Sequence, residues 1–184
     1  NFNIELLVDG QSIETISVSQ TIEPFSFSDI QFSVPQNFAS IGDYNITAVV
    51  THPQDEYANN DTLNVILSKV YNLDGALSTG EVNVICNDVV EMNTIITNQG
   101  ETTITSIKVQ VIVNGSIVDI INEDVEIPFL EQETITIAID DNLQQNNNYI
   151  TLNLLSVNNQ TDQSITNNST SGFTNLESSY DIIT

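Results

Sequence analysis

Two acidic stretches of the sequence carry the side chains that a calcium ion would need. The candidate ligands are Asp55, Glu56, Asn59 and Asp61 in the first stretch, and Asp140 and Asp141 in the second. Calcium is bound by about six to eight oxygen atoms of carboxylates, amides and backbone carbonyls. Neither stretch has the spacing of an EF-hand loop. The competing interpretation is that these side chains bond to the backbone of their own turns, so calcium binding is a hypothesis.

Other chemistry has little support in the residue types present. His52 is the only histidine, it stands directly before Pro53, and no Gly-x-Ser-x-Gly motif accompanies it. The sequence therefore contains no recognisable motif for a Ser-His-Asp catalytic triad. Cys86 is the only cysteine, which excludes an internal disulfide and a multi-cysteine zinc site. No glycine-rich phosphate motif is found, and we expect no enzymatic activity.

The charge balance excludes several classes of partner. The chain has 184 residues, 25 Asp and Glu, only Lys69 and Lys108 as basic residues, and a formal net charge of −23. Nucleic-acid binding needs clustered basic side chains, and so does contact with an anionic membrane surface. No apolar run approaches the roughly 20 residues that span a bilayer. The chain opens directly on strand-like sequence, so we expect an internal or processed segment without a signal peptide.

Alternation of apolar and polar residues dominates the chain and predicts β-strands. Val, Ile and Thr fill these runs, and Asp9-Gly10 and Asn114-Gly115 between them predict hairpin turns. No stretch has a sustained helical stripe, so we expect an all-β chain with helix limited to a turn or two. The predicted strands are 2–8, 11–18, 26–34, 44–51 and 62–69 in the first half, and 73–85, 88–97, 103–113, 116–122, 132–139, 149–157 and 170–176 in the second.

An internal repeat divides the chain into two modules, predicted at 1–71 and 72–184. The matching pairs are Phe2–Gly10 with Ile107–Gly115, Pro24-Phe25 with Pro128-Phe129, Ile46-Thr47 with Ile150-Thr151, and 52–62 with 158–170. About seven short strands per module is typical of an Ig-like β-sandwich. Tyr44 is placed to form a tyrosine corner, and Tyr149 is its near equivalent in the second module.

The first module lacks a counterpart for residues 72–105, which carry the two opening strands of the second. An Ig-like module without these strands has an apolar inner face that is half uncovered. Three interpretations stay open. Residues before Asn1 supply the strands, the module is a five-stranded variant, or another chain supplies them by β-augmentation. The open edge is therefore a candidate site for a neighbouring chain.

The run from Ile95 through Thr97-Asn98-Gln99-Gly100 to Asn114-Gly115 resembles CARDB-like (cell-adhesion-related) Ig-like modules of secreted Bacteroidetes-type bacterial surface proteins. The resemblance implies a tandem Ig-like spacer or adhesion segment, located outside the cell or on its surface. Other domains of the same large protein would be its partners. The alternative is a carbohydrate- or protein-binding accessory module of a secreted hydrolase.

Overall fold

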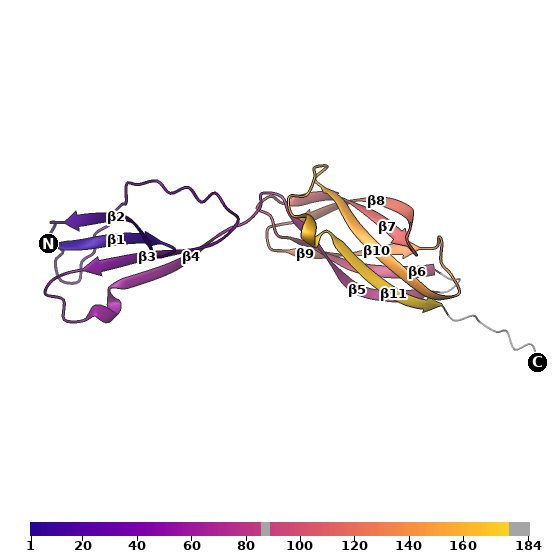
Figure 1. Ribbon diagram of the computed structural model, residues 1–184, viewed down its shortest axis with the longest axis horizontal. Coiled ribbons are helices and arrows are strands. Elements are labelled where there is room, and N and C mark those ends of the chain that lie inside the picture. The colour runs from indigo at the N-terminus through magenta and orange to yellow at the C-terminus, as the bar shows by residue number, and fades with distance from the viewer. Residues whose placement is uncertain (86–88, 177–184) are drawn as a thin grey trace, which may run out of the picture. The chain divides into compact units, whose positions relative to one another are not determined.

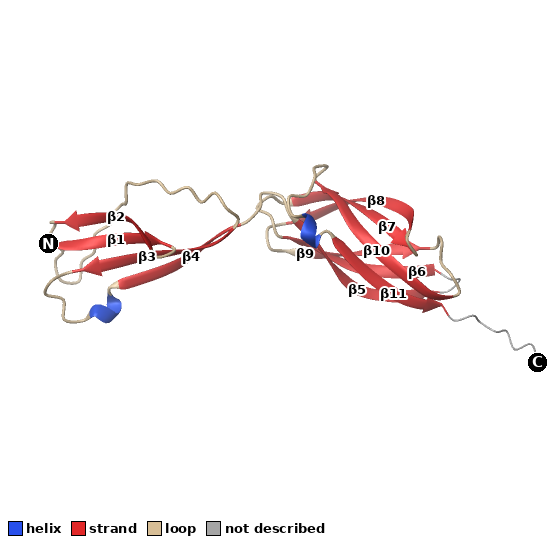
Figure 2. Ribbon diagram, in the orientation of Figure 1, coloured by secondary structure: helices blue, strands red, loops and turns tan. Residues whose placement is uncertain are grey.

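The computed structural model describes residues 1–85 and 89–176, so Cys86 lies outside the described residues. The chain divides into two compact units, Asn1–Val70 and Tyr71–Thr184 (Figure 1). Nearly all of the regular structure is β-strand. Among the described residues, the two helical segments are single 3-10 turns, η1 (Ala58–Asn60) and η2 (Ile165–Asn167) (Figure 2). The prediction of an all-β chain is confirmed.

The first unit is one antiparallel sheet of four strands. These are β1 (Phe2–Val8), β2 (Gln11–Val18), β3 (Gly42–Thr51) and β4 (Thr62–Lys69), in the order β2-β1-β3-β4. The hairpin between β1 and β2 turns at Asp9 and Gly10, whose φ angles of 49° and 76° are both positive. This is the type I′ turn that Asp-Gly predicts, because its twist matches that of the strands.

The second unit is an Ig-like sandwich of two antiparallel sheets. Its strands are β5 (Gly75–Ile85), β6 (Val89–Asn98), β7 (Ile104–Val113), β8 (Ser116–Ile127), β9 (Gln132–Ile139), β10 (Asn146–Val157) and β11 (Ser169–Leu176). One sheet has the order β11-β10-β7-β8 and the other β5-β6-β9. Alternate residues of each strand fill a core of 19 hydrophobic side chains. Among the described residues, Val18 is the only buried hydrophobic side chain of the first unit.

The four-stranded sheets of the two units are built in the same way. The strand order β2-β1-β3-β4 matches β8-β7-β10-β11, and a bulge interrupts the first hairpin at Leu6/Leu7 and at Val111/Ile112. Asp9 accepts a hydrogen bond from the Asn45 backbone N–H at 2.8 Å, as Asn114 does from that of Tyr149 at 3.1 Å. The repeat found in the sequence is thus also a repeat of local hydrogen bonding.

The repeat is shifted by one residue in the turn that follows the second strand. Phe25 and Leu130 both have a φ of 64°, and Ser26 and Glu131 donate the equivalent backbone bonds at 3.0 Å. Phe25 is therefore equivalent to Leu130, and the sequence pairing of Pro24-Phe25 with Pro128-Phe129 is one residue out. Backbone conformation sets this equivalence, and side-chain identity does not reveal it.

The tyrosine corner predicted at Tyr44 is confirmed. Its hydroxyl donates to the Ser40 carbonyl at 2.8 Å and accepts from the Ser40 N–H at 3.0 Å. In the second unit the equivalent residue is Asn148, and the prediction of Tyr149 is wrong by one position. The Asn148 amide bonds to the Gln144 carbonyl at 2.8 Å and N–H at 2.7 Å. The Asn148 amide and the Tyr44 phenol thus close equivalent corners, and each bonds to the backbone of the residue four positions earlier.

The predicted strand 26–34 is wrong, because residues 19–41 contain no strand (Figure 2). Its equivalent in the second unit is β9, whose one ladder partner is β6. The described residues of the first unit contain no equivalent of β6. A strand needs a partner for its backbone N–H and C=O groups, so the same alternating pattern forms a strand only in the second unit. The first unit is one sheet and not a pair of stacked sheets.

Asn98 and Gly100 fix the connection between the two sheets of the second unit. Asn98 is fully buried, and its amide donates to the carbonyls of Thr102 at 2.9 Å and Ile127 at 2.8 Å. Its side-chain oxygen accepts from the Gly100 N–H at 3.0 Å. A Cβ on Gly100 would lie 2.5 Å from the backbone nitrogen of Asp74. The Asn-x-Gly motif is therefore structural.

Substitution Asn98→Ala should destabilise the second unit by about 3 kcal/mol, because each buried partner left unpaired costs roughly 1–3 kcal/mol. Chemical denaturation of the second unit, followed by NMR, measures this loss. Asn122→Ala on β8 is the matched control, since Asn122 is exposed, and it should change stability by less than about 0.5 kcal/mol. Equal stability of the Asn98 and Asn122 variants would contradict the structural role of Asn98.

Candidate functional site

The first predicted calcium stretch forms a loop that includes η1 and leads into β4. The Asp55 carboxylate accepts a hydrogen bond from the Tyr57 N–H at 2.9 Å. This bond, followed by a bond from Asp61, holds the pKa of Asp55 below its ordinary value. Burial, followed by the contact with Asp55, raises the pKa of Asp61. Of the four predicted ligands, the structure thus joins Asp55 and Asp61, while Glu56 and Asn59 are exposed beside them.

The equivalent loop of the second unit binds its own opening hairpin. Asp162 is buried and accepts hydrogen bonds from the N–H groups of Gly75 and Ser164, both at 2.8 Å. Burial raises the pKa of Asp162 above its ordinary value, and these two bonds offset only part of the rise. Gln163 accepts from the Leu73 N–H at 2.9 Å, and Asn167 donates to Asp74 at 2.8 Å. The loop therefore clamps the start of β5.

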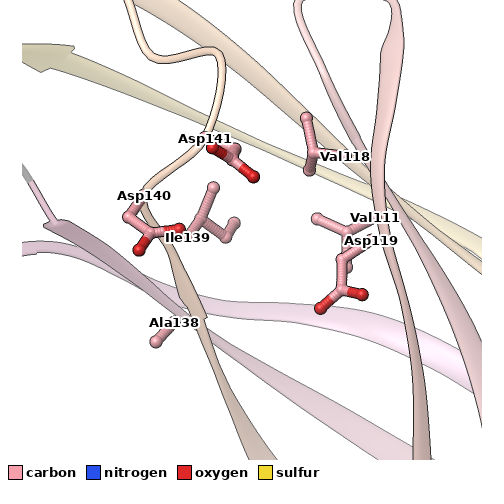
Figure 3. Close-up of a pocket in the computed structure, with 7 residues that line it drawn as sticks. All are labelled: Val111, Val118, Asp119, Ala138, Ile139, Asp140 and Asp141. Atoms are coloured by element: carbon pink, nitrogen blue, oxygen red, sulfur yellow. The ribbon is translucent and has the colours of Figure 1, made fainter.

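The second predicted calcium pair lies at the rim of a small polar pocket of about 270 Å³. Figure 3 shows Asp140 and Asp141 on one side of this pocket and Asp119 of β8 on the other. Val111 and Ile139 are buried at its base. The sequence did not predict Asp119, because only the folding of β8 toward the end of β9 brings it near. The pocket presents carboxylates, which suit a cation or a basic side chain.

Neither acidic region assembles a compact cluster of metal ligands. In residues 1–85 and 89–176, no group of three or more His, Cys, Asp or Glu side chains is close enough to hold a metal ion. Calcium binding at Asp55, Glu56, Asn59 and Asp61, or at Asp140 and Asp141, therefore stays a prediction of the sequence.

In the first unit, Glu14 is equivalent to Asp119, because Glu14 pairs with Leu6 as Asp119 pairs with Val111. We call Glu14 a tether, since it bonds a loop to β2. Its carboxylate accepts hydrogen bonds from the Ser33 N–H at 2.7 Å, the Ser33 hydroxyl at 2.6 Å and the Val34 N–H at 2.9 Å. The Ser33 hydroxyl and then the Val34 N–H hold the pKa of Glu14 below its ordinary value of 4.5. These bonds fix the segment equivalent to the end of β9 against β2.

His52 lies at the edge of an apolar groove in the first unit. Its Nδ1 accepts a hydrogen bond from the Gln54 N–H at 3.2 Å. The groove has a volume of about 390 Å³ and is otherwise lined by Phe2, Ile4, Ile22, Ser28, Ile30 and Val50. Most of its lining is apolar, so the groove suits contact with an apolar group.

The two acidic loops, the tether and the groove thus belong to an Ig-like β-sandwich unit and an open sheet of the same design. No family model matches the chain, and no curated protein matches it. The solved structures that are similar to this chain include two of the CARDB domain of the PF1109 protein from Pyrococcus furiosus. The crystal structure, in complex with di-metal ions, has 17% identity and a TM-score of 0.47. The solution NMR structure has 19% identity and a TM-score of 0.42.

Each comparison covers 59% of this chain and 98% of that domain. The neighbours carry the same domain name as the family that the sequence resembles. At this level of similarity none of their properties is transferred, and the di-metal ions are a feature of that protein. Among the described residues, this chain has no helix that is both long and apolar enough to cross a membrane.

The tether predicts a titration in the first unit. Because the pKa of Glu14 is lowered, its bonds stabilise the segment at pH values above 4.5 and are lost as the pH falls through the lower, folded-state value. NMR titration should show the Ser33 and Val34 amide signals shifting with a midpoint below 4.5. Glu14→Gln should remove this shift, and Glu5→Gln should leave it unchanged. A midpoint at or above 4.5 would overturn the tether.

Calcium binding predicts that EDTA lowers the melting temperature and that added calcium restores it, because a ligand that binds the folded state stabilises it. Asp61→Asn should abolish the response if the first loop holds the ion, and Asp141→Asn if the second does. Magnesium at equal ionic strength is the control for charge screening. An unchanged melting temperature in calcium and in EDTA would remove the hypothesis.

Proposed function

We propose that this chain is a non-catalytic structural segment, made of tandem Ig-like modules, of a larger exported bacterial surface protein. The observation that carries the proposal is that one sheet design occurs twice, with the same bulge, turn and loop bonds. Repeating a module lengthens a protein without adding a reactive centre. The other domains of that protein would be its partners, outside the cell or on its surface.

The charge and the histidine environment support a passive role. A net charge of −23 keeps a protein soluble and repels other acidic surfaces, including nucleic acid. His52 is bonded to its own loop and borders a groove whose lining is mostly apolar. The alternative is a ligand-binding accessory module of a secreted hydrolase. It predicts that the chain binds to immobilised carbohydrates on a glycan array, whereas a spacer would not bind.

The terminal strands of the second unit lie side by side, which suits a segment that transmits force. The Thr79 hydroxyl of β5 contacts the Thr170 hydroxyl of β11 and donates to the Ser171 carbonyl at 3.0 Å. Further along both strands, Val82 approaches Gly172. The residue numbers rise together, so β5 and β11 run parallel. Force applied to the two ends of the unit therefore acts on this pair in shear.

Single-molecule pulling on the second unit tests the proposal. We expect a single unfolding step that lengthens the chain by roughly 32 nm, since the residues from Gly75 to Leu176 extend by about 3.5 Å each and the folded unit already spans about 4 nm. Thr79→Ala should lower the unfolding force without changing this length, because it removes the bond to Ser171. Thr134→Ala on β9 is the matched control. Equal forces for wild type and Thr79→Ala would contradict a force-resisting role for this pair.

A further inference from the structure

The inner faces of the two four-stranded sheets have the same residue positions but different burial. Strand pairing makes β1 equivalent to β7, β3 to β10 and β4 to β11. In the second unit the face is at most 3% exposed at Ile107, Val109, Val111, Val113, Ile150 and Leu152. The equivalent residues of the first unit are only half-buried: Phe2, Ile4, Leu6, Val8, Ile46 and Ala48.

The inner side of β4 is the most exposed part of this face. Leu63, Val65 and Leu67 are 64%, 52% and 42% exposed. They pair with Ala48, Ile46 and Tyr44 of β3, which gives them the places of Thr170, Gly172 and Thr174 in β11. Thr170 and Thr174 are buried. Three large apolar side chains therefore lie open where the second unit has small, covered ones.

The hairpin β5–β6 is what covers this face in the second unit. A Cβ on Gly172 would lie 2.6 Å from Val82 of β5 and 3.3 Å from the Met92 side chain of β6. β6 also pairs along β9 from Val90↔Ile139 to Thr97↔Gln132. In the first unit, the segment equivalent to β9 has no such ladder, and the apolar groove lies beside it.

The loop before β4 retains the side chains that clamp this hairpin in the second unit. The turn bond of Asp55 to Tyr57 at 2.9 Å repeats that of Asp162 to Ser164 at 2.8 Å. When Asp55 is aligned with Asp162, Glu56 is equivalent to Gln163 and Asn60 to Asn167. Glu56 carries a side-chain oxygen as Gln163 does, and Asn60 carries the same amide as Asn167. The loop and the apolar face thus point independently to the same occupant.

We propose that the first unit binds an antiparallel β-hairpin that leads directly into β1. In the second unit, β6 leads into β7 through a short connection from Gln99 to Thr103, which sets the direction of approach. The second strand of the hairpin pairs with residues 28–34 and converts them to a strand. Its first strand lies beside β4, and its N-terminal end is held by Asp55.

The shape of the face defines the chemistry of this hairpin. Val65 occupies the place of Gly172, so the positions equivalent to Val82 and Met92 must carry smaller side chains than in the second unit. Leu63 occupies the place of Thr170, which contacts Thr79. An apolar residue is therefore expected in place of Thr79. The occupant resembles β5–β6 in pattern but differs in these sizes.

A fusion tests the proposal in the full chain. A copy of residues 72–105 carrying Thr79→Val, Val82→Ala and Met92→Ala is placed before Asn1. The amides of residues 28–34 should exchange with solvent at least about tenfold more slowly than in the unfused chain, and binding of the dye ANS should fall. The matched control fusion carries Val90→Ser, Met92→Ser and Ile96→Ser and should leave exchange and dye binding unchanged. Melting of the second unit reports folding in every sample.

Three outcomes would overturn the proposal. In the first, the alanine fusion and the serine control protect residues 28–34 equally while the second unit melts normally. In the second, the unfused chain already protects these amides and binds no ANS. In the third, the unfused chain is a dimer by analytical ultracentrifugation and loses ANS binding on dimerisation, so that a second copy covers the face. Loss of protection in the fusion on Asp55→Ala would support the clamp.

Discussion

The pairing of β6 with β9 is the interaction on which the sandwich depends. It satisfies the backbone of β9 and places Ile135, Ile137 and Ile139 against the other sheet, where each is at most 9% exposed. The first unit has an equivalent alternating segment but no equivalent pairing among its described strands. Its sheet forms through its own ladders, while its inner face stays half-buried. One missing ladder therefore separates a closed core from an open face.

The same dependence explains why equivalent carboxylates behave differently. Asp162 is buried because β5 covers it, and burial raises its pKa. Asp55 makes the same turn bond without a covering strand, and that bond holds its pKa low. Glu14 and Asp119 occupy equivalent positions and also differ. Glu14 bonds a loop to β2, whereas Asp119 faces a pocket at the end of β9. Local sequence sets the turn, and the neighbouring strands set the electrostatics.

Acidic side chains in this chain therefore have several structural tasks in addition to providing net charge. They close turns, tether a loop and clamp a hairpin, and one of the carboxylates that the sequence suggested as calcium ligands, Asp55, closes a turn. In each of these contacts a carboxylate bonds to backbone N–H groups and stabilises the fold. These contacts also show why an acidic cluster alone is weak support for a metal site, since backbone N–H groups compete for the same oxygens.

The sequence by itself determined what depends on neighbouring residues. Period-two alternation located most of the strands, Asp9-Gly10 located a hairpin, and Tyr44 located a corner. Only the tertiary structure decided what depends on distant partners. It left 26–34 without a strand, replaced Tyr149 by Asn148 at the corner, and placed Asp119 across a pocket from Asp140. The physical reason is that a strand, a buried amide and a pocket each need groups that are far away in the chain, and alternation alone does not encode which groups will meet.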